Sequence, residues 1–252
     1  MNTAVEELKL DFHGIDGLFY KKMRGAYRGV NSEAYKSEED GVGPTDRRWI
    51  QFLDSSEKIT ENFIDDNGGV RISDLAADKY GYTINPCGEP LKVLHEILRS
   101  PKYWSVLANA PRDNESMQLD GFSIPEERKI YFKEGIYENQ KNFVIAHELS
   151  HFLLGHKGKI FYKTSRMTDD VEKETKKKLY EREEYNEEAD KLAAILLMPY
   201  LFMYKYSKEG KSDSELSVIF NVPIRAVEKR RKEFKREVDV FCYTPASRRI
   251  QV

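Results

Sequence analysis

The chain has 252 residues, a formal net charge of −2, and 40% hydrophobic residues. This length and composition predict a folded protein with a sizeable core, and the small net charge gives no general reason to expect nucleic-acid or membrane affinity. Two widely spaced cysteines fit a reducing compartment better than a disulfide scaffold. The longest apolar run, 192–204, contains Pro199 and is too short for a membrane-spanning helix. The N-terminus has no secretory signal pattern, so we expect a cytoplasmic protein.

The first part of the chain is expected to be mainly helical. Residues 1–46 have no sustained hydrophobic period and are predicted to form an N-terminal extension. The apolar spacing of 47–66 favours one or two helices, and 71–80 favours another with Ser73 as its N-cap. A short helix at 91–99 is expected after the turn-rich NPCGEP sequence.

The central part combines two strands with two longer helices. Residues 119–133 predict two short strands joined by a PEER turn. A helix is expected at 138–154, with Gly155 as the residue that follows its end. Residues 157–178 are predicted to be a charged loop, and a helix is expected at about 179–198.

The C-terminal part has the spacing of a helix-turn-helix, with two amphipathic segments on either side of an NVP turn within 212–236. The basic run KRRK at 229–232 could contact DNA. We favour the alternative, in which both helices pack on the core, because glutamates alternate with the basic residues. The predicted domains are therefore the extension, a core at 47–206 and a helical tail at 207–252.

Three of the five histidines lie in one otherwise apolar stretch, FVIAHELSHFLLGH at 143–156. His147, Glu148 and His151 form H-E-x-x-H, and positions i and i+4 of a helix share one face. Two imidazoles can therefore bind a single zinc ion, while the glutamate reaches a water molecule activated by it. Without a metal, two unpartnered buried histidines would cost free energy. We predict a zinc site with Glu148 as the general base, although manganese or iron would also suit such ligands.

The third zinc ligand is less obvious from the sequence. The metzincin spacing is absent, because Leu154 and Lys157 stand where that pattern has glycine and histidine. His156 follows Gly155, where the helix is expected to end. We therefore expect it to support the site or to act as a cation at the helix end, rather than to be a ligand.

Carboxylates in the later helix, 181–199, are better candidates. Helical geometry places Glu188 at the edge of the apolar face, from which it can reach a metal in the core. Glu184 is the reserve candidate. Glu187 and Asp190 are expected to point to solvent.

The two helical segments resemble motifs of the ImmA/IrrE family of metallo-endopeptidases over roughly 70–205. The first motif is FVIAHELSHFLL, and the second is EADKLAAILLMP at 188–199. The resemblance implies an α+β fold: a small, mostly helical zincin with a short β-sheet next to the HExxH helix, followed here by the helical tail. It also implies that His147 and His151 are zinc ligands, Glu148 is catalytic and Glu188 is the matching acid.

The resemblance further implies site-specific cleavage of a regulatory protein, commonly a helix-turn-helix repressor of mobile-element or stress-response genes. Family members often carry an N-terminal helix-turn-helix domain, but 1–46 lacks that pattern. Direct nucleic-acid binding is therefore not expected. Ser150 stands where many members have glycine, which is a mild departure.

A zinc-dependent endopeptidase is thus the leading hypothesis. One alternative is a non-proteolytic, metal-binding regulatory module that binds a protein partner or DNA. Another is a DNA-binding protein that acts through its tail. A tyrosine could donate a hydrogen bond to the oxyanion of a tetrahedral intermediate. The sequence does not choose among the candidates, which are Tyr131, Tyr137, Tyr185 and Tyr200.

Overall fold

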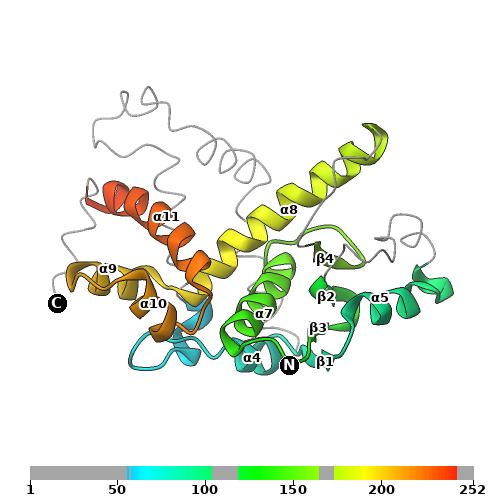
Figure 1. Cartoon of the computed structure of the whole chain (residues 1–252), viewed down its shortest axis with the longest axis horizontal. Helices are drawn as coiled ribbons and strands as arrows, with labels where there is room; N and C mark the ends of the chain where they lie inside the picture. The colour runs from blue at the N-terminus through cyan, green and yellow to red at the C-terminus, as the bar shows by residue number, and fades with distance from the viewer. Residues whose placement is uncertain (1–55, 57, 104–118, 165–172, 243–252) are drawn as a thin grey trace.

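The structure is a computed structural model that describes residues 56, 58–103, 119–164 and 173–242. Only the backbone is described at 163–164, 173–184 and 235–242. The predicted extension and the first part of 47–66 lie outside the described residues. Helices packed on a short sheet form an α+β fold, as the sequence predicts (Figure 1).

Four strands form one mixed sheet in the order β1-β3-β2-β4. The strands are β1 (Thr83–Cys87), β2 (Leu119–Ile124), β3 (Lys129–Lys133) and β4 (Phe161–Thr164). Strand β1 pairs in parallel with β3, whereas β2 is antiparallel to both β3 and β4. The predicted hairpin is confirmed as β2 and β3, joined by a 3-10 turn, η5 (Pro125–Glu127), and by Arg128 in the left-handed conformation.

The two outer strands are not predicted by the sequence analysis. Strand β1 contains Pro86, and its sequence is typical of a turn. Proline is nevertheless compatible with an edge strand, where its missing N–H group need not pair with a neighbouring strand. Strand β4 lies at the opposite edge, inside the segment 157–178 predicted to be a loop. That segment also ends earlier than expected, because the following helix begins at Lys173.

The helices predicted between residues 71 and 236 are present, with shifted boundaries in some cases. They are α4 (Ile72–Asp74) continuing as the π-helical η3 (Leu75–Lys79), α5 (Pro90–Leu98), α7 (Glu138–Leu153), α8 (Lys173–Leu197), α9 (Tyr200–Lys208), α10 (Asp213–Ile219) and α11 (Ile224–Cys242), with 3-10 turns at η2 (Glu61–Phe63) and η4 (Pro101–Tyr103). Ser73 lies inside α4 and is not its N-cap, which is Arg71. None of the described helices is both long and apolar enough to cross a membrane.

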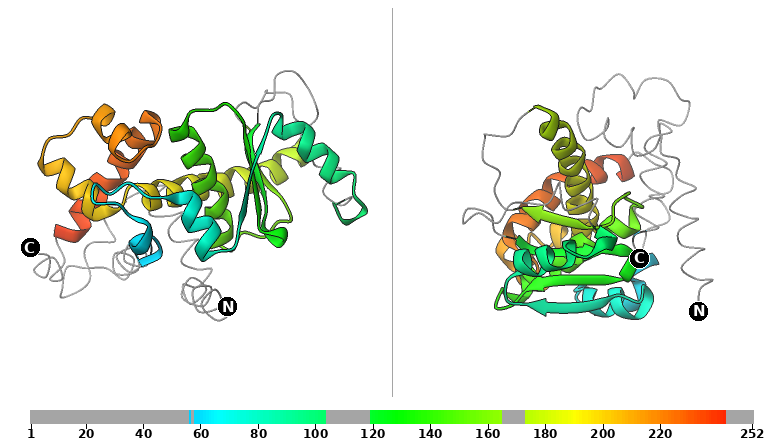
Figure 2. Two further views of the ribbon diagram at one scale, coloured as in Figure 1. Left: turned by 90° about the horizontal axis from the view of Figure 1, so that it is seen from below. Right: turned by 90° about the vertical axis from the view of Figure 1, so that its right-hand side faces the viewer.

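The sheet separates two hydrophobic cores, with α5 on one face and α7 on the other (Figure 2). Side chains alternate along β2, so that Phe122 and Ile124 pack in the core beside α5. Gly121 and Ser123, at the alternate positions of β2, face α7, where Gly121 meets Val144 and Ser123 meets Glu148. The HExxH helix therefore lies directly on β2, which is one of the two inner strands.

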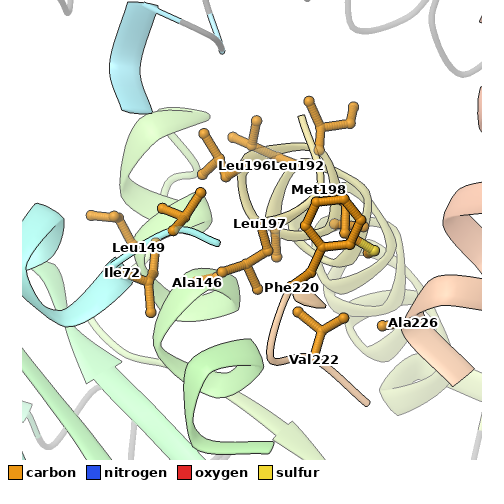
Figure 3. Close-up of a cluster of buried hydrophobic side chains, with 14 of the residues drawn as sticks. Ile72, Ala146, Leu149, Leu192, Leu196, Leu197, Met198, Phe220, Val222 and Ala226 are labelled. Carbon is orange, nitrogen blue, oxygen red and sulfur yellow. The ribbon is translucent and has the colours of Figure 1, made fainter. Parts of the chain in front are cut away.

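The larger core joins α7 to the C-terminal helices. Ala146 and Leu149 of α7 pack in the same buried cluster as Leu192 and Leu196 of α8 (Figure 3). The apolar end of α8 is buried on every side, from residue 192 to residue 197, which is the pattern of a helix surrounded by protein.

The predicted tail packs into this same core. Phe220, Val222 and Val227, around the turn between α10 and α11, are all at most 1% exposed. Ser212 and Glu215 form a capping box at the start of α10. The expected pair of helices joined at the NVP turn is confirmed.

Two of the basic side chains in the run at 229–232 make contacts within the protein. Arg230 is fully buried and donates from Nε to the Met198 carbonyl, 3.2 Å away. Arg231 donates to Asp213 and also to the carbonyl of Lys211. These contacts explain why α11 carries arginines in a packed tail. They also mean that neutralising Arg230 would disturb packing rather than report on DNA contact.

Gly121 permits the close approach of α7 to the sheet. A Cβ atom at this position would overlap Val144 Cγ1 and would lie 2.6 Å from the Tyr131 carbonyl oxygen. We expect Gly121→Ala to lower the free energy of unfolding by about 1–3 kcal/mol in urea titrations, because backbone must move to relieve the clash. Gly88→Ala is the matched control, since a Cβ at Gly88 meets no atom within 4 Å. Equal stability of the two variants would contradict this account of the packing.

Candidate metal centre

The end of α7 is shaped by a C-terminal capping motif. Gly155 has a φ of 63° and donates its N–H to the Phe152 carbonyl, while His156 donates its N–H to the His151 carbonyl. These two bonds are the Schellman pattern, which brings the second residue after the cap back over the last turn of the helix. The predicted helix end at Gly155 is confirmed. The chain reversal places His156 beside His151.

His147 and His151 lie on one face of α7, as the H-E-x-x-H spacing predicts. Both are almost fully buried, and their Nε2 atoms are 3.2 Å apart. Two imidazole nitrogens held at about 2.0–2.1 Å in a tetrahedral zinc site are roughly 3.4 Å apart. The separation of the two nitrogens thus fits a pair of ligands to one ion.

Each of these histidines has its other nitrogen occupied. Nδ1 of His147 is 2.9 Å from Asp190 Oδ1 on α8. Nδ1 of His151 is 2.8 Å from Nδ1 of His156. Because an ionised carboxylate only accepts hydrogen bonds, His147 carries its proton on Nδ1 and presents a bare Nε2. A carboxylate behind a metal-binding histidine fixes the ring and raises its basicity.

Asp190 was expected to point to solvent, and that expectation is wrong. Its side chain is only 16% exposed and it is bonded to His147. Glu188 and Asp190 lie on either side of Ala189, which is fully buried. The prediction from helical geometry was wrong for Asp190 because Ala194 and Leu197, which lie in line with it on α8, are buried. Glu187 is exposed, as expected.

Glu188 reaches the histidine cluster through His156. Its Oε2 is 3.0 Å from His156 Nε2, and its side chain is 14% exposed. Within the part of the chain that the structure describes, no three His, Cys, Asp or Glu side chains converge to form a complete metal-binding group. The side chain of the reserve candidate Glu184 is not among those described. The third-ligand role of Glu188 stays a prediction.

Glu148 is buried where α7 packs on the sheet. It is 1% exposed, and Ser123 of β2 donates its hydroxyl to Glu148 Oε2 over 2.6 Å. This bond holds one carboxylate oxygen. Ser150 uses its hydroxyl within the helix, donating to the Ala146 carbonyl at 2.7 Å, so its replacement of glycine leaves no buried hydroxyl without an acceptor.

Aromatic rings enclose the histidines. His151 stacks on Phe161 of β4 with ring centroids 4.3 Å apart, and His156 stacks on Tyr185 of α8 at the same distance. Tyr185, one of the four tyrosines considered from the sequence, thus contacts this cluster. Tyr137, by contrast, is 82% exposed at the start of α7. These contacts exclude water from the imidazoles and so strengthen electrostatic interactions at the site.

Tyr82 is a further candidate functional residue, which the sequence analysis did not identify. It is 3% exposed, and its hydroxyl has no hydrogen-bond partner in the described part of the chain. Burial raises the pKa of this phenol far above its usual value, the guanidinium of Arg128 opposes that shift, and the carboxylate of Glu148 adds to it. The phenol of Tyr82 therefore lies within the electrostatic influence of Glu148.

The two facing imidazoles and the neighbouring buried glutamate are the arrangement of an HExxH metallohydrolase. The model of the peptidase family described as the IrrE N-terminal-like domain matches residues 111–232. Residues 111–232 therefore match the ImmA/IrrE family, whose members are generally metal-dependent peptidases. No curated protein and no solved structure matches the chain significantly. The matched region extends past residue 206, where the predicted core ends. The predicted domain boundaries stay a prediction.

Asp190 provides a test of how the metal-binding histidines are supported. We expect Asp190→Ala to weaken zinc binding by about 10–100-fold in chelator competition, because His147 loses the acceptor that fixes its tautomer. Glu187→Ala is the matched control, since it removes an exposed carboxylate from the same helix. If both variants bind zinc as tightly as the wild type, Asp190 does not support the site.

Proposed function

We propose that the chain is a zinc-dependent endopeptidase of the cytoplasm that cleaves a specific regulatory protein. The observation that carries this proposal is the convergence of the His147 and His151 Nε2 atoms beside the buried carboxylate of Glu148. Two neutral imidazoles and a general base are the groups that metal-assisted hydrolysis requires. The match to a peptidase family supports a peptide bond as the bond that is cut.

The ion would be held by His147, His151 and, as the sequence predicts, Glu188. A zinc ion bound there would polarise a peptide carbonyl and lower the pKa of a water molecule. The histidines supply uncharged nitrogens, so the site keeps a net positive charge that favours an oxyanion. Asp190 holds the orientation of His147 throughout.

Glu148 performs the proton transfers in this proposal. It accepts a proton from the attacking water and returns that proton to the leaving amine nitrogen as the peptide bond breaks. Its hydrogen bond from Ser123 restrains one oxygen and so orients the carboxylate. Pure metal binding does not need a carboxylate at this position. The buried, oriented Glu148 therefore favours proteolysis over the alternative of a non-catalytic module.

The substrate is proposed to be a transcriptional repressor of the helix-turn-helix type. The ImmA/IrrE resemblance suggests this class, and a peptidase in the cytoplasm must be selective to be tolerated. The internal contacts of Arg230 and Arg231 support a packing role for the tail rather than a nucleic-acid interface. Recognition would then depend on the folded substrate protein.

We expect Glu148→Gln to retain zinc and to lose cleavage by at least 100-fold, because the amide cannot accept the proton. Wild type and variant would each be incubated with the soluble proteome of the source cells, and new protein N-termini would be identified by mass spectrometry. A small set of new termini should require both the wild type and zinc. Glu187→Gln should behave as the wild type.

Two results would count against the proposal. Identical new termini with Glu148→Gln would show that a different residue, or a contaminant, does the chemistry. A zinc-loaded wild type that generates no new termini in any proteome fraction would favour the non-proteolytic module instead.

A further inference from the structure

His156 occupies a position that normally belongs to an apolar side chain. In a Schellman motif, the residue two places after the cap folds back onto the residue three places before it, and the two usually make a hydrophobic contact. Here those two positions are His156 and His151, and their Nδ1 atoms are 2.8 Å apart. The geometry that Gly155 imposes on the backbone therefore creates a contact between two imidazoles.

The second nitrogen of His156 continues the chain of contacts. Its Nε2 is 3.0 Å from Oε2 of Glu188, and the His156 side chain is only 4% exposed. Tyr185 stacks on the ring and holds its plane. His156 thus links a histidine on α7 to a carboxylate on α8, within a site shielded from solvent.

The positions of the protons follow from the acceptors. A carboxylate can only accept, so His156 carries a proton on Nε2 and, when neutral, has a bare Nδ1. That lone pair accepts a hydrogen bond from the Nδ1–H group of His151, so that the neutral ring of His151 has no proton on Nε2. Asp190 imposes the same tautomer on His147. Two lone pairs thus face each other at 3.2 Å, an arrangement that repels unless a cation lies between them.

We propose that His156 is a positioning residue that sets the tautomer of His151 and at the same time holds the carboxylate of Glu188. This inference rests on the metal site of the proposed function. It assigns to one side chain the support of two groups from different helices. The bond to His156 orients the carboxylate of Glu188, for which the sequence predicts a ligand role.

The test is the zinc affinity of His156 variants, measured by chelator competition on the full chain. We expect His156→Ala to weaken zinc binding by about 10–100-fold. His156→Gln should recover a substantial part of this loss, because an amide can accept from His151 with its oxygen and donate to Glu188 with its nitrogen. Lys157→Ala, an exposed change at the same helix end, should leave the affinity unchanged.

A double-mutant cycle separates bridging from a general loss of structure. If His156 supports Glu188, the combined effect of His156→Ala and Glu188→Ala on zinc affinity should be smaller than the product of the single effects. Independent effects that multiply, or a His156→Ala variant that binds zinc as tightly as the wild type, would overturn the bridge. Absence of zinc binding by the wild type would instead overturn the metal site itself. The visible spectrum of the Co²⁺-substituted protein gives a further readout, which should change in His156→Ala and not in Lys157→Ala.

Discussion

The approach of two buried imidazole nitrogens is the constraint on which the site depends. Nε2 of His147 and Nε2 of His151 are 3.2 Å apart, and both histidines are at most 2% exposed. Such an approach is unfavourable for two bare lone pairs and favourable once a cation is bound between them. The surrounding side chains hold the groups of the site in place. Asp190 contacts His147, His156 contacts His151, and Ser123 donates to Glu148.

The residues of the site on α7 could be predicted because they follow local rules. The i, i+4 spacing places His147 and His151 on one face whatever the tertiary structure. A glycine after an apolar helix predicts the cap at Gly155. The hairpin of β2 and β3 also follows from local sequence, since strand-forming residues flank a turn. The contact of Glu188 with the cluster followed from its place at the edge of the apolar face of α8.

The remaining features depend on packing between distant segments. Asp190 was misjudged because α8 is buried on all sides from Leu192 to Leu197, so a residue just before that stretch and away from the predicted apolar face can still meet α7. Ser123 is 25 residues away from Glu148 in the sequence, and only the register of β2 under α7 brings them together. Tyr82 immediately precedes an edge strand that contains a proline, a sequence pattern that suggests a turn. No local pattern in the sequence signals these contacts.

The most direct test of the account is the zinc content of the protein, determined by elemental analysis after purification without chelators. The wild type is predicted to carry about one zinc ion per chain. The double variant His147→Ala, His151→Ala should carry essentially none under identical conditions, while remaining folded by circular dichroism. A wild type without bound metal even after zinc addition, or a double variant that retains as much zinc as the wild type, would contradict the claim that these two imidazoles form a metal centre.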